Sequence, residues 1–152
     1  MNRRTRGFEI VKDDMRKTDG EIILPTRSDH RSAGYDIYAP ANYKCEPHKV
    51  TKIWTDIKAY MKDDEVLLID VRSSMGGKFH LANTIGVIDS SYYENESNDG
   101  NVGVFLVNDT DEVINIEKNE RIAQGLFMNY LITDNDKPLS DTRTGGFGSS
   151  GK

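Results

Sequence analysis

The stretch EVLLIDV, residues 65–71, indicates the fold class of this chain. Its apolar run is only four residues long and is bounded by acidic residues, which favours a short buried strand. Similar runs bounded by turn residues recur about every 12 to 15 residues, close to the spacing of an all-β sandwich or barrel. They occupy residues 8–11, 21–24, 35–38, 49–54, 55–61, 101–107 and 112–117.

Helical signals are few. Residues 121–132, RIAQGLFMNYLI, are long enough for a helix, but Gly125 and bulky side chains on every face suit a buried strand better. One short helix is expected after Arg72, where Ser73 or Ser74 offers an N-cap, although two following glycines lower the helix propensity. The sequence therefore predicts an all-β chain with at most one short helix.

The composition is that of one small domain. The chain has 152 residues, 36% of them hydrophobic, and its apolar runs are far too short to cross a bilayer. Cys45 is the only cysteine, which excludes an intrachain disulfide and a thiolate zinc cluster. The basic N-terminus is not followed by the apolar segment of a secretory signal. We therefore expect a cytoplasmic protein with no membrane partner.

The charge balance narrows the class of ligand. The chain carries 20 Lys and Arg against 25 Asp and Glu, a net charge of −5, which argues against a nucleic-acid polymer as partner. Residues 1–17 hold six basic and three acidic side chains, for which a solvated basic end is the favoured interpretation. An anionic small ligand would therefore need a local cluster of positive charge.

Two polar segments stand apart from the strand-like runs. Residues 93–100, YENESNDG, end in an Asp-Gly turn and favour a mobile, tolerated hairpin extension. Residues 140–152, SDTRTGGFGSSGK, form a tail whose Arg143 and Phe147 are residue types that clamp a phosphate and stack on a base. We expect one β domain over residues 1–139 and a flexible C-terminal segment over residues 140–152.

Familiar catalytic signatures are absent from the sequence, which has no P-loop, no HExxH, no GxSxG and no histidine pair at metal-ligand spacing. Five other segments carry a functional signal. They are AGYDIYA at 33–39, VRSSMG at 71–76, NTIGVIDSSYY at 83–93, ERIAQG at 120–125 and RTGGFGSSG at 143–151. In this order and spacing they resemble the five motifs of the homotrimeric dUTPases, which hydrolyse dUTP to dUMP and pyrophosphate. The extra segment after Tyr92 and the RTGGFG spacing look most like the branch found in Gram-positive bacteria and their phages.

The resemblance implies an architecture and a cofactor. The fold would be a jelly-roll-type antiparallel β-barrel, assembled as a homotrimer with shared active sites at the subunit boundaries and with dUTP as substrate. Mg²⁺ would be bound mainly through the substrate phosphates, because this ion keeps several waters and rarely needs a protein cage. Asp36 of the first motif then has two open roles: it holds a water of the metal shell, or it fixes a neighbouring strand.

The third motif supplies the catalytic and base-binding residues that the resemblance implies. Asp89 matches the aspartate that binds the deoxyribose 3′-hydroxyl and orients the attacking water as a base, although taken alone it reads as a turn residue. Tyr92 matches an aromatic ring on the sugar, which leaves no space for a ribose 2′-hydroxyl. A glycine in this segment would leave room for the base. The residues expected at the uracil are Asn83, Gly86, Val87 and Ile88.

Phosphate contacts are implied for three other motifs. Three residues lie at the entry to the predicted short helix, where free N–H groups favour anions: Arg72, Ser73 and Ser74. Gln124 matches the glutamine that contacts the α-phosphate. In the tail, Arg143, Phe147 and Gly148 match residues that meet the terminal phosphate and cover the uracil ring, so that the tail acts as a lid.

The chain departs from the family pattern at four places. Val71 stands where a proline is usual, and Asn119 stands where glycine is common and tolerates the left-handed conformation of a turn. Only three residues separate Arg143 from Phe147, one fewer than in the commonest pattern, and six extra residues follow Tyr92.

Two other functions stay open. A dCTP deaminase shares the fold and an RSS motif, but this chain keeps the Asp and Tyr of GVIDSSY and a complete GGFGSSG tail. The other is the role of a phage-type dUTPase that binds a regulatory protein partner through residues 93–100.

Overall fold

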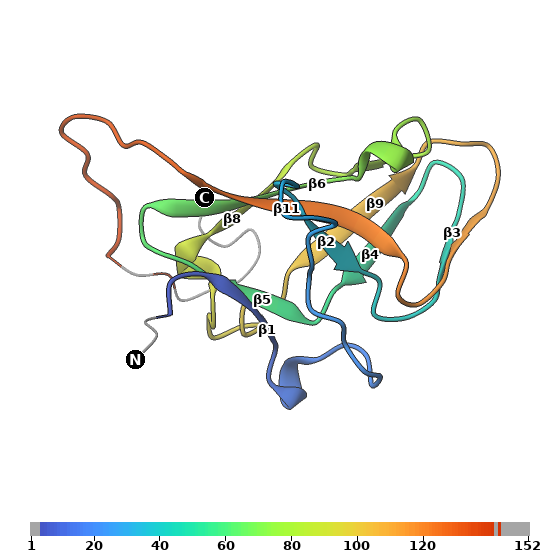
Figure 1. Ribbon diagram of the computed structural model, residues 1–152, viewed down its shortest axis with the longest axis horizontal. Coiled ribbons are helices and arrows are strands. Elements are labelled where there is room, and N and C mark those ends of the chain that lie inside the picture. The colour runs from blue at the N-terminus through green and yellow to red at the C-terminus, as the bar shows by residue number, and fades with distance from the viewer. Residues whose placement is uncertain (1–3, 142, 144–152) are drawn as a thin grey trace.

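Antiparallel strands make up the fold of the computed structural model, which describes residues 4–141 and 143 (Figure 1). They are β1 (Gly7–Ile10), β2 (Tyr35–Tyr38), β3 (Tyr43–Cys45), β4 (Val50–Trp54), β5 (Ile57–Tyr60), β6 (Glu65–Asp70), β7 (Phe79–Leu81), β8 (Gly86–Asp89), β9 (Gly103–Asn108), β10 (Ile114–Ile116) and β11 (Arg121–Asn129). The helices of this part of the chain are three 3₁₀ turns, η1 (Asp13–Met15), η2 (Ser73–Met75) and η3 (Ser90–Tyr92). The predicted all-β antiparallel class is confirmed.

A four-stranded sheet with the order β2-β11-β6-β8 positions most of the predicted site residues. Side chains alternate between its two faces, as expected for pleated strands. Leu67 and Ile69 of β6 are buried, and the residues opposite them on β8, Ile88 and Gly86, are buried too. The alternate residues form the outer face, where Val87 is 56% exposed.

One apolar core joins this sheet to the three-stranded sheet β4-β9-β7. Ile37 and Leu67 reach the core from the first sheet, and Ile53 and Val104 reach it from the second, each at most 1% exposed. Two-stranded sheets, β1-β5 and β10-β3, complete the strand pairing of the described residues. Burying each such aliphatic side chain contributes roughly 1.5–3 kcal/mol, which stabilises the frame beneath the site.

Two predicted turn conformations are confirmed. Asn119, expected to accept a left-handed backbone, has a φ of 71°. The Asp-Gly turn is also present, because Asp99 and Gly100 have φ values of 60° and 86°.

The predicted strand over residues 21–24 is wrong. Ile23 and Leu24 are 40% and 38% exposed, and this run forms no ladder with another strand of the described chain. Only Ile22 of the run packs against the core. A short apolar run does not show whether a partner strand is available, and none of the strands described over residues 4–141 pairs with this run.

The predicted short helix is a single 3₁₀ turn, η2, and its expected serine cap is wrong. Arg72 is the N-cap, in an extended conformation and without a side-chain cap hydrogen bond. The chain after the two glycines then enters β7, which sequence patterns do not predict. No helix of the described residues is both long and apolar enough to span a membrane.

β11 is the buried strand expected over residues 121–132, but it ends at Asn129. Asn129 pairs with Glu65, the first residue of β6, so the chain beyond it has no strand to pair with on that side. Leu131 and Ile132 are consequently 96% and 70% exposed. In Figure 1 the orange-to-red segment after β11 extends away from the sheets as an arm.

The basic N-terminal end is exposed, as the sequence favours, and its described arginines also form ion pairs: the Arg4 and Arg6 side chains are 58% and 43% exposed. Arg4 lies 3.1 Å from a carboxylate oxygen of Glu9, and its guanidinium carbon is 3.9 Å from the centre of the Tyr60 ring. Arg6 lies 2.7 Å from a carboxylate oxygen of Glu65 in β6. The Arg6 pair links the chain beside β1 to β6.

Candidate active site

Residues from three of the five motifs meet at one small pocket of about 330 Å³. It is lined by Ser28, Ser32, Ala33, Gly34, Asp36, Arg72, Ser73, Gln124 and Leu126. Of the predicted phosphate-binding residues, Arg72, Ser73 and Gln124 are therefore brought together, next to Asp36 of the first motif.

Asp36 contacts other residues in and beside this pocket through both of its carboxylate oxygens. Its side chain in β2 is 9% exposed, and Oδ1 accepts a hydrogen bond from Nε of Arg72 at 3.0 Å. Oδ2 accepts from Oγ of Ser28 at 3.2 Å and lies 3.5 Å from Nη1 of Arg121. A buried carboxylate needs such partners because desolvation of an isolated charge is costly. Asp36 thus contacts residues of neighbouring elements, including Arg121 of β11, and its role in holding a water of the metal shell stays a prediction.

Gln124 stands in β11 between Asp36 of β2 and Asp70 of β6. Its Nε2 donates to the backbone oxygen of Val71 at 3.2 Å. A Cβ on Gly34 would overlap Oε1 of Gln124, so a larger residue there would require the glutamine to change its side-chain conformation. The Val71 N–H donates to Oδ1 of Asp70 at 2.7 Å, a bond that the usual proline could not form.

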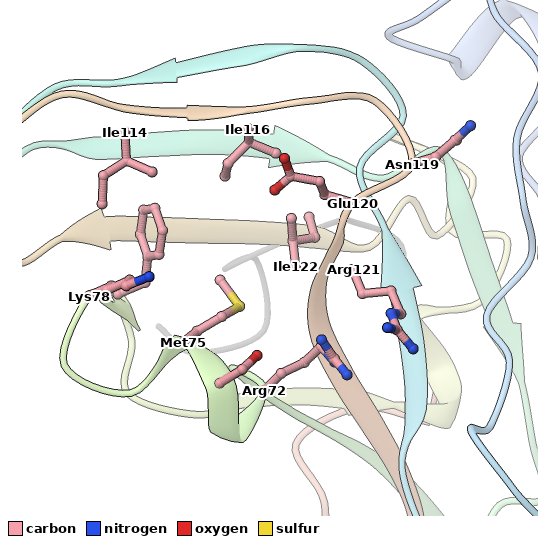
Figure 2. Close-up of a pocket in the computed structure, with 11 residues that line it drawn as sticks. Arg72, Met75, Lys78, Ile114, Ile116, Asn119, Glu120, Arg121 and Ile122 are labelled. Carbon is pink, nitrogen blue, oxygen red and sulfur yellow. The ribbon is translucent and has the colours of Figure 1, made fainter.

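A second pocket, of about 550 Å³, adjoins the first at Arg72, which lines both (Figure 2). Its apolar wall is formed by Met75, Phe79, Ile114, Ile116 and Ile122. In Figure 2 Met75 faces the isoleucines across the pocket. Ser74 lines this larger pocket and Ser73 lines the smaller one, so the two serines expected at the phosphates lie on different sides of Arg72.

β8 carries the third motif along a sheet edge. Among the described residues it pairs with β6 alone, so its other side presents backbone N–H and C=O groups that no strand covers. Such an edge can hydrogen-bond the edge of a planar base. Asn83 is exposed in the turn that leads into β8, where Thr84 has a φ of 68°.

Gly86 is a glycine for a different reason from the one expected. Its Cα faces the core, and a Cβ there would lie 3.1 Å from Cβ of Ile69 in β6. The missing side chain therefore makes room for the neighbouring strand. Ile88 is 3% exposed, so any base contact of these two residues would come from their backbone.

Asp89, at the end of β8, meets the first described residue of the fifth motif. Nη2 of Arg143 lies 3.1 Å from Oδ2 of Asp89, and its guanidinium carbon is 5.6 Å from the centre of the Tyr92 ring. Burial raises the pKa of the Tyr92 hydroxyl. Asp89, the 2%-exposed Tyr92 and Arg143 thus lie together, while Phe147 and Gly148 lie outside the described residues.

Residues 93–100 contain functional candidates that sequence reasoning missed. The segment is folded and hydrogen-bonded, which differs from the mobile extension expected: Asn95 and Asp99 are 6% and 5% exposed. Asn98 donates to the hydroxyl of Tyr92 at 2.7 Å. The only sequence signal for this contact is the local density of asparagines after Tyr92.

The site residues of one chain form two separate groups on the outer face of the sheet. Asp89 is in register with Val66 and, across β6, with Met128, whereas Gln124 is in register with Asp70. The two rows are offset by four positions along β6, about 13 Å at the usual rise, and β8 and β11 are about 10 Å apart. The group around Asp89, predicted to bind the sugar and called the sugar-side group, is therefore distant from the group around Gln124, predicted to bind the phosphates and called the phosphate-side group.

The sequence profile of the dUTPase family matches residues 20–151. The chain belongs to the dUTPase family. The deoxyuridine 5′-triphosphate nucleotidohydrolase of Lactococcus lactis is 44% identical to this dUTPase over 149 residues, covering 96% of this chain and 97% of the relative. The human mitochondrial enzyme of the same name is 35% identical over 157 residues, covering 99% of this chain and 60% of the relative.

A solved structure agrees with this assignment. The crystal structure of dUTPase from Streptococcus mutans matches this dUTPase with a TM-score of 0.76 and 35% identity, covering 84% of this chain and 98% of that chain. The dUTPase from phage phi11 of S. aureus, at 19% identity and a TM-score of 0.68, shares the fold. The predicted dUTPase fold and the likeness to dUTPases of Gram-positive bacteria are confirmed, and this dUTPase is a dUTP-hydrolysing enzyme.

Proposed function

We propose that this dUTPase converts Mg–dUTP to dUMP and pyrophosphate by in-line attack of a water on the α-phosphorus, with Asp89 as the base. The observation that supports this role is the place of Asp89, a carboxylate 51% exposed at the end of the edge strand β8, beside Tyr92 and Arg143. A general base must lie within hydrogen-bond reach of the water that it deprotonates, and an exposed carboxylate oxygen meets that need.

The two separate groups of site residues favour a site completed by a second copy of the chain. In this proposal Asp89 and Tyr92 of one subunit face Arg72 and Gln124 of the next, within a homotrimer. Apolar side chains on and beside the outer face are exposed, as is typical of an interface: Ile85, Val87, Met128 and Tyr130, at 43–56%. The arm adds Leu139, which is 100% exposed and available to cover a neighbour.

Each part of the nucleotide has a proposed partner. The free edge of β8 around Val87, with Asn83, would bind the uracil, and Tyr92 would exclude a 2′-hydroxyl. The predicted phosphate partners are Arg72, Ser73, Ser74 and Gln124. The tail residues proposed as the lid over the base and the terminal phosphate are Arg143, Phe147 and Gly148.

The donor set fits a magnesium ion that arrives with the triphosphate. The dUTPase family uses Mg–dUTP. No group of three or more His, Cys, Asp or Glu in the described part of the chain could hold a metal ion, and both oxygens of Asp36 are engaged by arginines. The ion supplies charge neutralisation at the phosphates, and Arg72 would add a further cation beside them.

The decisive measurement is pyrophosphate release from dUTP, dTTP, dCTP and UTP, with and without Mg²⁺, together with ammonia release from dCTP. We expect pyrophosphate release from dUTP to be far faster than from the other three nucleotides. Ammonia from dCTP without pyrophosphate would favour the deaminase alternative.

Asp89→Asn tests the base directly. We expect nucleotide binding to persist and the rate on dUTP to fall by at least about 100-fold, the usual cost of losing a general base. Asp63→Asn, at an exposed residue before β6, is the matched control and should keep its rate. Near-normal turnover by Asp89→Asn would exclude this mechanism.

A further inference from the structure

Residues 93–100 do more than extend a hairpin, because they bond directly to Tyr92. The Tyr92 hydroxyl donates to the backbone oxygen of Asn101 at 2.6 Å and accepts from Nδ2 of Asn98 at 2.7 Å. The backbone oxygen of Tyr92 also accepts from Nδ2 of Asn95 at 2.8 Å. Asn95, Asn98 and Asn101 thus form an asparagine clasp around Tyr92.

The orientation of the Asn98 amide is determined by its own partners. Its Oδ1 accepts from Nδ2 of Asn95 at 2.7 Å and from the backbone N–H of Gly100 at 3.0 Å. With the oxygen occupied by two donors, the NH₂ group must be the part that faces the Tyr92 hydroxyl. Residue 98 can therefore donate this hydrogen bond to Tyr92 only if its side chain is an amide.

A buried ion cluster anchors the clasp to distant segments. Oδ2 of Asp99 accepts from Nζ of Lys58 in β5 at 2.9 Å and from the backbone N–H of Lys12 at 2.8 Å. Nζ of Lys58 also lies 2.8 Å from Oε2 of Glu94. Burial opposes the Lys58 charge, but its hydrogen bonds to the two carboxylates outweigh burial and raise its pKa. Breaking such a buried cluster is costly, so the clasp holds its place.

From this geometry we infer that Asn98 is a positioning residue that sets the selectivity of the site for deoxyribose. It acts through Tyr92, whose ring is proposed to face the sugar, so this role rests on the proposed function. A ring excludes a 2′-hydroxyl only while it stays in place, and close packing makes sub-ångström shifts matter. The Tyr92 hydroxyl is the end of the ring farthest from the backbone, where a hydrogen bond limits tilt most.

The test is Asn98→Asp in the full-length enzyme. Aspartate keeps the size of the side chain and the acceptor for Asn95 and Gly100, but it removes the donor to Tyr92. We expect the ratio of kcat/KM for dUTP to kcat/KM for UTP to fall about tenfold, as the loss of one hydrogen bond predicts. Asn115→Asp, the same substitution at an exposed residue of β10, is the control and should leave this ratio unchanged.

Tyr92→Phe is the second variant, because it removes the anchored hydroxyl and keeps the ring. It should lower the same ratio, and the double variant with Asn98→Asp should lower it no further, since both act on one contact. Asn98→Ser serves the same comparison if the aspartate variant does not fold.

The outcomes separate this role from the proposed function. An equal loss on dUTP and UTP would show that Asn98 has only a structural role, and it would overturn the inference. A normal ratio for folded Asn98→Asp, with a lowered ratio for Tyr92→Phe, would overturn it as well. A wild-type enzyme without preference for dUTP over UTP would instead overturn the proposed role of Tyr92.

Discussion

Buried charged side chains in this dUTPase each have more than one partner, and most of those partners lie far along the chain. Five such residues are described as buried: Asp36, Asp56, Lys58, Glu65 and Asp99. Asp56, for example, accepts from the backbone N–H groups of Lys17 and Thr18, which holds the segment after η1 against the core. Desolvation makes an isolated buried charge unfavourable, so a buried charge must keep its partner. The chain segment that carries the partner is thereby held in place.

The stability contributed by the Arg6–Glu65 pair depends on pH. The Glu65 side chain is 7% exposed, and hydrogen bonding from Arg6 lowers its pKa below the ordinary value of 4.5, against the effect of burial and with help from the Lys62 N–H. A lowered pKa contributes stability that is fully present above pH 4.5 and is lost as the pH falls through the folded-state value.

We therefore expect Glu65→Gln to be less stable than the wild type at about pH 7, and the difference to shrink at a pH below the lowered folded-state pKa of Glu65, where the wild-type carboxylate is protonated as well. Urea unfolding at the two pH values measures this. A stability difference that is the same at both would contradict the assigned role of the Arg6–Glu65 pair.

β8 combines a tightly packed inner face with an edge that no strand of the described chain pairs with. Gly86→Ala would place a methyl group 3.1 Å from Cβ of Ile69, so either β6 or β8 must shift. We expect a loss of about 1–3 kcal/mol in the free energy of unfolding, as overpacking usually costs. Because β8 also carries Asp89, turnover of dUTP should fall as well.

Gly76→Ala is the control for this substitution. The atom closest to an added Cβ would be the backbone oxygen of Ser73 at 3.4 Å, which is an ordinary contact. The φ of Gly76 is −57°. We expect a stability change below about 1 kcal/mol. Equal effects of the two alanine variants in chemical denaturation would argue against packing with Ile69 as the reason for Gly86.

Strands that the sequence marks as short apolar runs between turn residues were predictable within one or two residues. β2 has the predicted bounds, and β6 ends one residue earlier than predicted. β7 was missed because its three residues follow two glycines and lack a long pattern. The run at residues 21–24 has a strand-like composition but no partner, and pairing is a property of the folded chain.

At the scale of the whole molecule, the distance between the sugar-side and phosphate-side groups leads to a mixing experiment. Asp89→Asn and Arg72→Ala should each be inactive alone. If a site takes Asp89 from one subunit and Arg72 from another, random mixed trimers should regain about a quarter of the wild-type sites. Refolding the two variants together and measuring dUTP turnover tests this, with the separately refolded variants as controls. Absence of recovery in trimers of confirmed mixed composition would place both residues in one subunit's site.

The sequence by itself determined the fold class, the family and the candidate residues, because alternation, turn residues and motif order are local properties that short windows of sequence contain. The tertiary structure decided which strand edge stays open, that Asp36 holds Arg72, that Gly86 makes room for Ile69, and that Asn98 reaches the Tyr92 hydroxyl. These contacts depend on strand register, on the packing of distant segments and on how a turn folds back. Such geometry arises only when the whole chain has folded.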